Sequence, residues 1–206
     1  MAQILTFFDK EHKYTLDGDE IPSVSELSRF ASREIYQTVE QFQLDRAAAR
    51  GTAVHQACEN IDRYSEVKCN NDIAGYVKAY IKFRGEHPIE YDTIERAFAG
   101  DTPEGKFAGT IDRAGVFADG QTAIIDLKTS SVVQKPLAQI QLNAYKLLYE
   151  QNTGKKVDKL FILHLKKEGD YKLIEFPIDD TLFKACIALH YALKKKPRKK
   201  KETKDE

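Results

Sequence analysis

The sequence predicts a mixed α/β (α+β) fold in which a central mixed sheet is flanked by helices. Helical patterns dominate the chain up to about residue 90, three consecutive strand-like segments follow, and a helix, two strands and a final helix complete it. Elements in this order pack as a sheet covered by helices. With 206 residues, 42% of them hydrophobic and 31% charged, the chain has the composition of a globular protein with one core.

We expect one domain over residues 1–193, with an N-terminal hairpin and helical part at 1–90 and a core at 91–193. A disordered, lysine-rich tail is expected at 194–206, because this segment is of low complexity and almost free of apolar residues.

The N-terminal segment alternates apolar and polar residues around the letters DGDE, which predicts a hairpin. Ser23 precedes Glu26 by three residues, the spacing of a capping box, so we expect a helix to begin at Ser23. Residues 35–64 follow a helical pattern. We expect an interruption at Gly51 and Thr52, where Thr52 would cap a second helix.

The remaining expected elements follow from apolar periodicity and from Gly, Pro and Asp breaks between them. They are a helix at 72–85, strands at 93–99, 106–117 and 122–128, a helix at 136–150, strands at 159–166 and 172–177, and a helix at 180–193.

Charge and cysteine content exclude several classes of protein. The chain carries 32 basic and 32 acidic residues, and because the tail is strongly basic the rest is mildly acidic, so any nucleic-acid binding must rely on local charge and on metal. Three cysteines without CxxC spacing, Cys58, Cys69 and Cys186, argue against a disulfide framework, a zinc knuckle or an iron–sulfur cluster. No apolar run approaches the roughly 20 residues of a membrane span, and the start lacks a basic leader, so we expect a cytoplasmic protein.

The segments GTIDRAG and IIDLKTS place Asp112 and Asp126 on neighbouring strands, with Lys128 two residues beyond Asp126. Period-two alternation puts Asp126 and Lys128 on one face of their strand. Burying these charges beside Ile124 and Ile125 is unfavourable unless a partner compensates them, and a bound cation is such a partner. Two carboxylates that hold Mg²⁺ or Mn²⁺ next to an ammonium group are suited to phosphate chemistry.

The connection between these strands decides whether the two aspartates share a face. A two-residue loop of Asp119 and Gly120 would pair Asp112 with Leu127 and turn it away from Asp126. A three-residue loop at 119–121 would pair Asp112 with Lys128 and bring the three side chains together. We therefore expect the odd-length loop, with Gly120 or Gln121 in a left-handed conformation, or else a bulge near Gly115.

The motifs GTAVHQACE, GTIDRAG, IIDLKTS and QLNAY, in this order over roughly residues 50–145, resemble those of the RecB-type branch of the PD-(D/E)xK nucleases. The earlier segment IPSVSEL is similar to the lead-in of phage exonucleases and of the mitochondrial genome maintenance exonuclease. The resemblance implies a restriction-endonuclease-like core and a divalent-metal-dependent DNA exonuclease. Two departures are an Asp in place of the Glu of the third motif and the absence of the clustered cysteines that iron–sulfur members carry.

Carried over by motif, the resemblance implies that His55, Asp112 and Asp126 hold Mg²⁺ or Mn²⁺ and that Lys128 is the catalytic lysine. Gln141 and Tyr145, of the QxxxY pattern, would support the site or contact the DNA backbone. The resemblance would also match Glu95 to a further acidic position of the family.

Each candidate also has an ordinary structural interpretation. A lone histidine such as His55 on an apolar helix face is commonly a hydrogen-bonded core residue. Glu59 could pair with His55, as support for the site, or with Arg63. Gln141 and Tyr145 could simply pack, Arg50 could bind a phosphate or be a solvated charge, and the basic tail could grip phosphates or remain solvated.

The leading hypothesis is a phage-type exonuclease that acts on single-stranded DNA or duplex ends, with a phage recombination or replication protein as a further partner. The alternatives are a catalytically silent nuclease-fold protein that binds nucleic acid or a protein partner, and a structure-specific endonuclease. Presence of both acids and the lysine argues against the silent form. The sequence leaves cleavage polarity and oligomeric state open.

Overall fold

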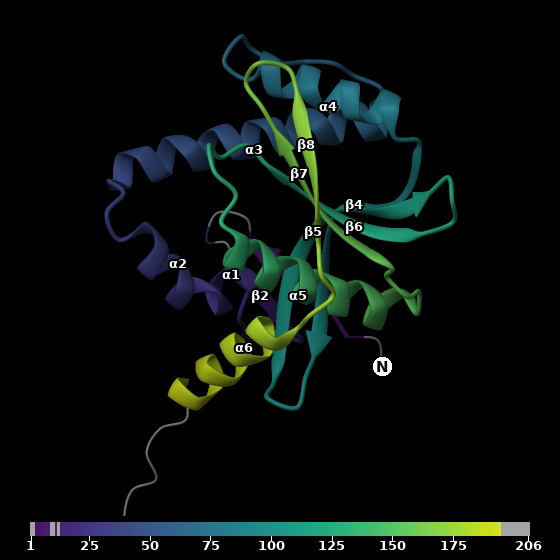
Figure 1. The fold of residues 1–206 in the computed structure, drawn as a ribbon. Helices are drawn as coiled ribbons and strands as arrows, with labels where there is room; N and C mark the ends of the chain where they lie inside the picture. Colours follow the sequence, from purple (N-terminus) through teal and green to yellow (C-terminus); the bar gives the residue numbers. More distant parts are fainter. Residues whose placement is uncertain (1–2, 9–10, 12, 195–206) are drawn as a thin grey trace, which may run out of the picture.

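The computed structural model describes residues 3–8, 11 and 13–194, so the predicted tail lies, from residue 195 on, outside the described part of the chain. Its main sheet has five strands in the order β4-β5-β6-β7-β8 (Figure 1). Strands β6 and β7 are parallel and the other neighbours are antiparallel, which makes the sheet mixed. The strands are β4 (Ile89–Asp101), β5 (Lys106–Phe117), β6 (Thr122–Lys128), β7 (Lys159–Leu165) and β8 (Tyr171–Phe176).

Helices cover both faces of this sheet, as the predicted fold class requires (Figure 1). On one face α5 (Lys135–Thr153) packs against β4 to β7, and α6 (Thr181–Lys194) packs against α5. On the other face α4 (Ala74–Glu86) contacts β7 and β8 and packs against α3 (Gln41–Tyr64). The mixed α+β fold is therefore confirmed. Within the described residues, none of the helices has the combination of length and apolar character needed to span a membrane.

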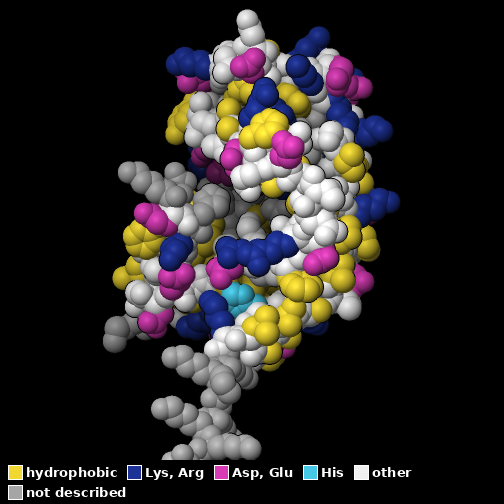
Figure 2. Space-filling model, turned by 90° about the vertical axis from the view of Figure 1, so that its left-hand side faces the viewer, with side chains coloured by type: hydrophobic (Ala, Val, Ile, Leu, Met, Phe, Trp, Pro, Cys, Tyr) yellow, Lys and Arg dark blue, Asp and Glu magenta, His cyan; other side chains and the backbone are white. Residues whose placement is uncertain are grey.

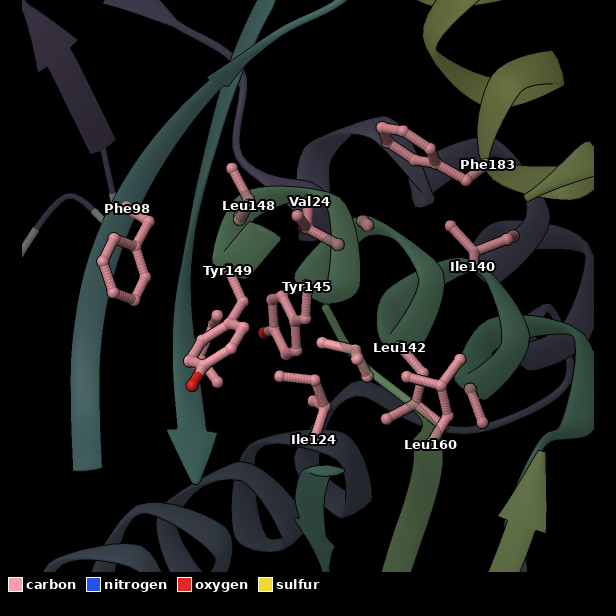
Figure 3. Close-up of a cluster of buried hydrophobic side chains, with 14 of the residues drawn as sticks. Val24, Phe98, Ile124, Ile140, Leu142, Tyr145, Leu148, Tyr149, Leu160 and Phe183 are labelled. Atoms are coloured by element: carbon pink, nitrogen blue, oxygen red, sulfur yellow. The ribbon is translucent and has the colours of Figure 1, made fainter. Parts of the chain in front are cut away.

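The core on the α5 face includes tyrosine as well as aliphatic side chains (Figure 3). Tyr145 and Tyr149 of α5 lie among Val24, Ile124 and Leu148. Burying each large side chain contributes roughly 1.5–3 kcal/mol, which fixes the position of α5 over the sheet.

The N-terminal part forms a second sheet of three strands, β1 (Leu5–Phe8), β2 (Lys13–Leu16) and β3 (Asp19–Ile21). The predicted hairpin is the β2–β3 pair, whose turn residues Asp17 and Gly18 both have positive φ, 54° and 91°. Positive φ at both positions is typical of a type I′ turn. Strand β1 is the third strand of this sheet, and the alternation of apolar and polar residues alone did not indicate it.

The helical region differs from its predicted outline. Ser23 caps α1 (Val24–Leu27), and its Oγ accepts a hydrogen bond from the Glu26 N–H at 3.0 Å, as the capping box predicts. After α2 (Arg29–Tyr36) the chain breaks at 37–40, and α3 then runs unbroken, so the predicted interruption at Gly51 and Thr52 is wrong. A mid-helix glycine costs about 1 kcal/mol, and packing of Val54 and the residues after it offsets this.

The β5–β6 connection is of odd length, as predicted, but begins one residue earlier. Phe117 N–H donates to Gln121 O at 3.0 Å and Gly120 N–H donates to Phe117 O at 2.9 Å, so the loop is 118–120. Gly120 has φ 85°, the predicted left-handed conformation. The pairing of Arg113 with Ile125 makes Asp112 and Asp126 the next residues along the two strands, so the predicted pairing of Asp112 with Lys128 is wrong.

The loop begins early because Asp119 stabilises it locally: its Oδ1 accepts a hydrogen bond from Gln121 N–H at 3.0 Å. The bulge considered near Gly115 is found in the neighbouring strand instead, as a register shift between Tyr91 and Thr93 of β4. Since the loop shift moves the register by two residues, Asp112 and Asp126 still face the same side of the sheet.

Candidate active site

Three potential metal ligands from different elements converge at the middle of the main sheet. His55 of α3, Glu95 of β4 and Asp112 of β5 each bring a ligand atom within 4.8 Å of the others. His55 Nδ1 lies 3.2 Å from Glu95 Oε1 and 3.5 Å from Asp112 Oδ2. Imidazole nitrogen and carboxylate oxygen are ligands that divalent cations accept.

Both ring nitrogens of His55 face acceptors. Nε2 lies 3.2 Å from the Leu127 carbonyl oxygen, while Nδ1 faces the two carboxylates. A neutral imidazole has only one N–H, so either the ring is protonated or a cation occupies the side facing the acids. Burial opposes protonation, but the charges of Asp112 and Glu95 outweigh it and raise the pKa of His55 to about 9. A histidine that donates one N–H to a carbonyl and points the other nitrogen at acids has the arrangement of a metal ligand.

The backbone of Leu127 also holds Asp112. Leu127 N–H donates to Asp112 Oδ2 at 2.8 Å. Burial raises the pKa of Asp112, and this is opposed by the His55 charge and the Leu127 hydrogen bond, whereas Glu95 raises it further. The carboxylate is therefore fixed in position but poorly compensated.

Asp126 is compensated on one oxygen only. Its side chain is 1% exposed, and its Oδ2 is paired with Lys128 Nζ at 2.5 Å, whereas its buried Oδ1 accepts no hydrogen bond from the described residues. Burial raises the pKa of Asp126 to about 6, although Lys128 opposes the shift. A buried carboxylate with one oxygen left without a donor, next to the His55 cluster, fits a divalent cation, whose charge would compensate it.

Lys128 is held by the QxxxY pair. Lys128 Nζ donates to Gln141 Oε1 at 2.9 Å, and Gln141 Nε2 donates to the Tyr145 hydroxyl at 2.8 Å. Burial lowers the pKa of Lys128, but Asp126 and Asp112 outweigh it and the net pKa is raised, so the amine stays an ammonium at neutral pH. Gln141 and Tyr145 thus lie where they would orient Lys128.

Two other candidates lie apart from this cluster. Glu59 Oε1 accepts from Arg63 Nε at 2.7 Å, which decides between its two possible partners in favour of Arg63 over His55. Arg50 lies nearer the start of the same helix, where its Nη2 donates to Thr129 O at 3.4 Å.

Arg113 lies inside the GTIDRAG motif but has no role among the expectations from the sequence. Its side chain is 0% exposed, and its Nη1 donates to Glu95 Oε1 at 3.0 Å while its Nε donates to Asp62 Oδ2 at 2.6 Å. Tyr80 also donates to Asp62. The signal that could have revealed Arg113 is a charged residue in a strand segment that is otherwise apolar.

The family model of the PD-(D/E)XK nuclease superfamily matches residues 73–204, which include Asp112, Asp126 and Lys128. The chain is similar to a crystal structure from Eubacterium rectale named as a candidate exonuclease, with 21% identity over 70% of this chain and 62% of that one, and a TM-score of 0.42. It thus spans less than two thirds of that protein. A crystal structure of SSO0001 shares 15% identity over 81% of this chain and 84% of the other, with a TM-score of 0.37. A search of curated proteins gives no match.

Proposed function

Since the chain belongs to the PD-(D/E)XK nuclease superfamily, we propose that it is a divalent-metal-dependent deoxyribonuclease that removes nucleotides from DNA ends. The mixed sheet flanked by helices is consistent with the restriction-endonuclease-like core of this superfamily. The observation that carries the proposal is the convergence of His55, Glu95 and Asp112 beside the Asp126–Lys128 ion pair.

The metal would be held by His55, Asp112 and Asp126, with Glu95 as a further ligand. Hard carboxylate oxygens favour Mg²⁺ or Mn²⁺ over softer ions. When bound, such an ion polarises a phosphate oxygen and lowers the pKa of a coordinated water. Asp126 supports this assignment because its buried Oδ1 lacks a hydrogen-bond donor among the described residues.

Lys128 acts as a cation in the proposed reaction, because its raised pKa keeps it protonated. Its ammonium group would orient the attacking water or stabilise charge that develops on the phosphate oxygens. The water oxygen bonds to phosphorus, the bond between phosphorus and the leaving sugar oxygen breaks, the water loses a proton to solvent and the leaving oxygen gains one. No covalent intermediate with the enzyme forms.

We base the proposal of exonuclease action, and of a phage-type role in DNA replication, recombination or genome maintenance, on the motif resemblance. A phage recombination or replication protein as partner and a cytoplasmic location remain predictions. A circular single strand has no ends, so an endonuclease can cut it and an exonuclease cannot. This substrate therefore distinguishes the two activities.

The test compares cleavage of end-labelled linear DNA by the wild type, Lys128→Ala and Asp112→Asn in Mg²⁺ or Mn²⁺. We expect each variant to lose roughly 10²–10³-fold in cleavage rate, as when one charge-stabilising group is removed. Lys184→Ala, on the distant helix α6, is the matched control and should cleave like the wild type.

Circular dichroism and thermal unfolding show whether the variants remain folded. Equal cleavage by all three proteins contradicts the proposal. Cleavage of a circular single strand at the rate of the linear one contradicts the exonuclease part alone.

A further inference from the structure

A groove outside the carboxylate cluster opens where β6 and β7 end side by side. Its volume is about 680 Å³. It is bounded by α3, by the start of α4 and by the turn between β7 and β8, and it is lined by three cations and a run of hydroxyl residues: Arg50, Lys166, Lys167, Thr129, Ser130 and Ser131. The reaction proposed above uses none of these residues.

Arg50 lies in the lining of the groove and is held there by Thr129 and Tyr76. Its Nη2 reaches Thr129 O at 3.4 Å, and its guanidinium lies 5.8 Å from the centre of the Tyr76 ring. Its Nε is buried and has no hydrogen-bond partner among the described residues. The N–H groups at the other end of the guanidinium are well suited to donate hydrogen bonds to phosphate oxygens.

Lys166 lies beside His164. Lys166 Nζ lies 3.1 Å from His164 Nε2, and His164 Nε2 lies 2.6 Å from Ser130 O. Burial lowers the pKa of His164, so the ring is neutral at pH 7. One ring nitrogen cannot both donate to Ser130 O and accept from Lys166. The shorter contact to Ser130 makes Nε2 a donor, which leaves the N–H groups of Lys166 available to a ligand.

The turn that carries the two lysines is fixed against α4. A Cβ atom at Gly75 would lie 1.7 Å from Lys167 O, so only glycine allows this approach of helix and turn. Gly169, with φ 88°, completes the turn. Lys166 and Lys167 are therefore held over the groove by packed backbone.

The groove also contains acidic groups, which do not cancel its positive charge. Glu168 and Asp170 line it, but the Asp170 carboxylate forms an ion pair with Lys82, whose Nζ lies 2.9 Å from Asp170 Oδ1. On the face shown in Figure 2, Lys and Arg side chains are interspersed with Asp and Glu side chains, in keeping with the balanced net charge. An anion must therefore be recognised by a local arrangement such as this one.

The groove adjoins the candidate active site. Ser130 lines it and also lines a smaller hollow of about 150 Å³ that contains Lys128 and Gln141. A nucleic-acid strand with one phosphate at Lys128 would therefore have a path past Ser130 into the groove.

We propose that the groove lined by Arg50, Lys166, Lys167 and residues 129–131 is a subsite for a backbone phosphate of the nucleic-acid strand, next to the phosphate that is cut. The inference rests on the proposed function, which supplies the strand. The subsite adds affinity and sets the register of the strand, and it takes no part in the chemical step. The recognised group is the phosphodiester, whatever the base.

The test measures binding of a fluorescein-labelled single-stranded oligonucleotide by anisotropy, in Mg²⁺ and on the Asp112→Asn background, over a range of salt concentrations. Lys166→Ala and Lys167→Ala should each weaken binding several-fold for all base sequences. Each should also reduce the slope of log K against log salt by about 0.7, the value for one phosphate contact of a single strand. Lys166→Arg should restore binding, and Lys184→Ala should leave it unchanged.

The outcomes separate this inference from the proposed function. If the background protein binds the oligonucleotide and the double variant Lys166→Ala/Lys167→Ala has the same affinity and salt slope, the subsite is refuted and the nuclease proposal stands. If the background protein binds no nucleic acid, both fail. Inorganic phosphate should displace the oligonucleotide no better than sulfate at equal ionic strength; specific displacement by phosphate would identify a free-phosphate site and overturn the inference.

Discussion

His55 Nδ1 lies 3.2 Å from Glu95 Oε1, although the two residues are 40 positions apart and belong to a helix and a strand. Glu95 reaches this position with φ 41°, a left-handed conformation inside β4. The β4–β5 pairing is recorded on both sides of it, at Ile94 and Arg96. A non-glycine residue in this conformation costs on the order of 1–3 kcal/mol and commonly marks a functional site.

Glu95→Gln should weaken Mn²⁺ binding roughly 10–100-fold, a loss of the size seen when groups around a metal ligand are altered. The amide keeps the shape of the side chain and can still accept from Arg113, so the effect would come from the lost charge. Isothermal titration calorimetry measures it. Glu59→Gln is the matched control, because Glu59 pairs with Arg63; an equal loss in both variants would remove Glu95 from the ligand set.

The stability of the metal-free protein should fall as pH rises from about 6.5 to about 9. The pKa of His55 is about 9 in the folded state and 6.5 for an unperturbed imidazole, so between these values the folded state binds more protons than the unfolded state. The stabilisation is complete below pH 6.5 and is lost above pH 9, and it amounts to at most about 3 kcal/mol. Urea unfolding in EDTA at several pH values measures it, and His55→Gln should flatten the dependence. The same slope in both proteins would contradict the pKa of His55.

Arg113→Met should destabilise the protein by roughly 3–5 kcal/mol, because it leaves the carboxylates of Asp62 and Glu95 without their buried partner. Arg113→Lys should recover only part of this, since an ammonium cannot reproduce two separate guanidinium contacts. Chemical denaturation gives both values. Arg84→Ala is the control at the rim of the same cluster, where Arg84 Nε lies 3.3 Å from Asp62 Oδ1. If Arg113→Met lowers the free energy of unfolding no more than Arg84→Ala does, the stabilising role of the Arg113 ion pairs is contradicted.

Gln141→Ala should lower the cleavage rate constant at saturating DNA by about 10²-fold, since a displacement of about 1 Å in a catalytic group has an effect of this size. The substitution removes the acceptor that holds Lys128 Nζ. Tyr145→Phe removes only the hydroxyl that accepts from Gln141, so its effect should be smaller. Single-turnover cleavage separates the chemical step from binding. A larger loss of cleavage rate for Tyr145→Phe than for Gln141→Ala would contradict the inference that Gln141 holds Lys128 directly and Tyr145 acts through Gln141.

Strand patterns and the capping box predicted most of the fold because both arise from local physics. Strands β5 and β6 have their predicted limits, and Ser23 caps its helix. The break at Gly51 was wrong because tertiary packing outweighs the local preference of one glycine. The loop register was displaced because the Asp119 side chain contacts the backbone, and alternation of apolar residues does not encode that contact.

The residues of the candidate site that lie within one motif could be predicted from the sequence. The contacts between residues far apart in the sequence could not. Asp126 and Lys128 share a strand face, so their ion pair follows from period-two geometry. The contact of Glu95 with His55 depends on a left-handed residue and on the buried Arg113, which tertiary packing alone determines. The same holds for the groove at Arg50, whose lysines lie on a turn more than a hundred residues away.

Leu127 contributes to the site only atoms that every residue except proline possesses. Its N–H holds Asp112 and its carbonyl oxygen faces His55, whereas its own side chain is buried in the core on the side of α3 and α4. We therefore expect the position to tolerate exchange among apolar side chains of similar volume, because its contacts to Asp112 and His55 come from the peptide groups. A scan by alanine would report only a packing defect there, and only proline, or an ester in place of the amide, would reveal the role of the peptide group.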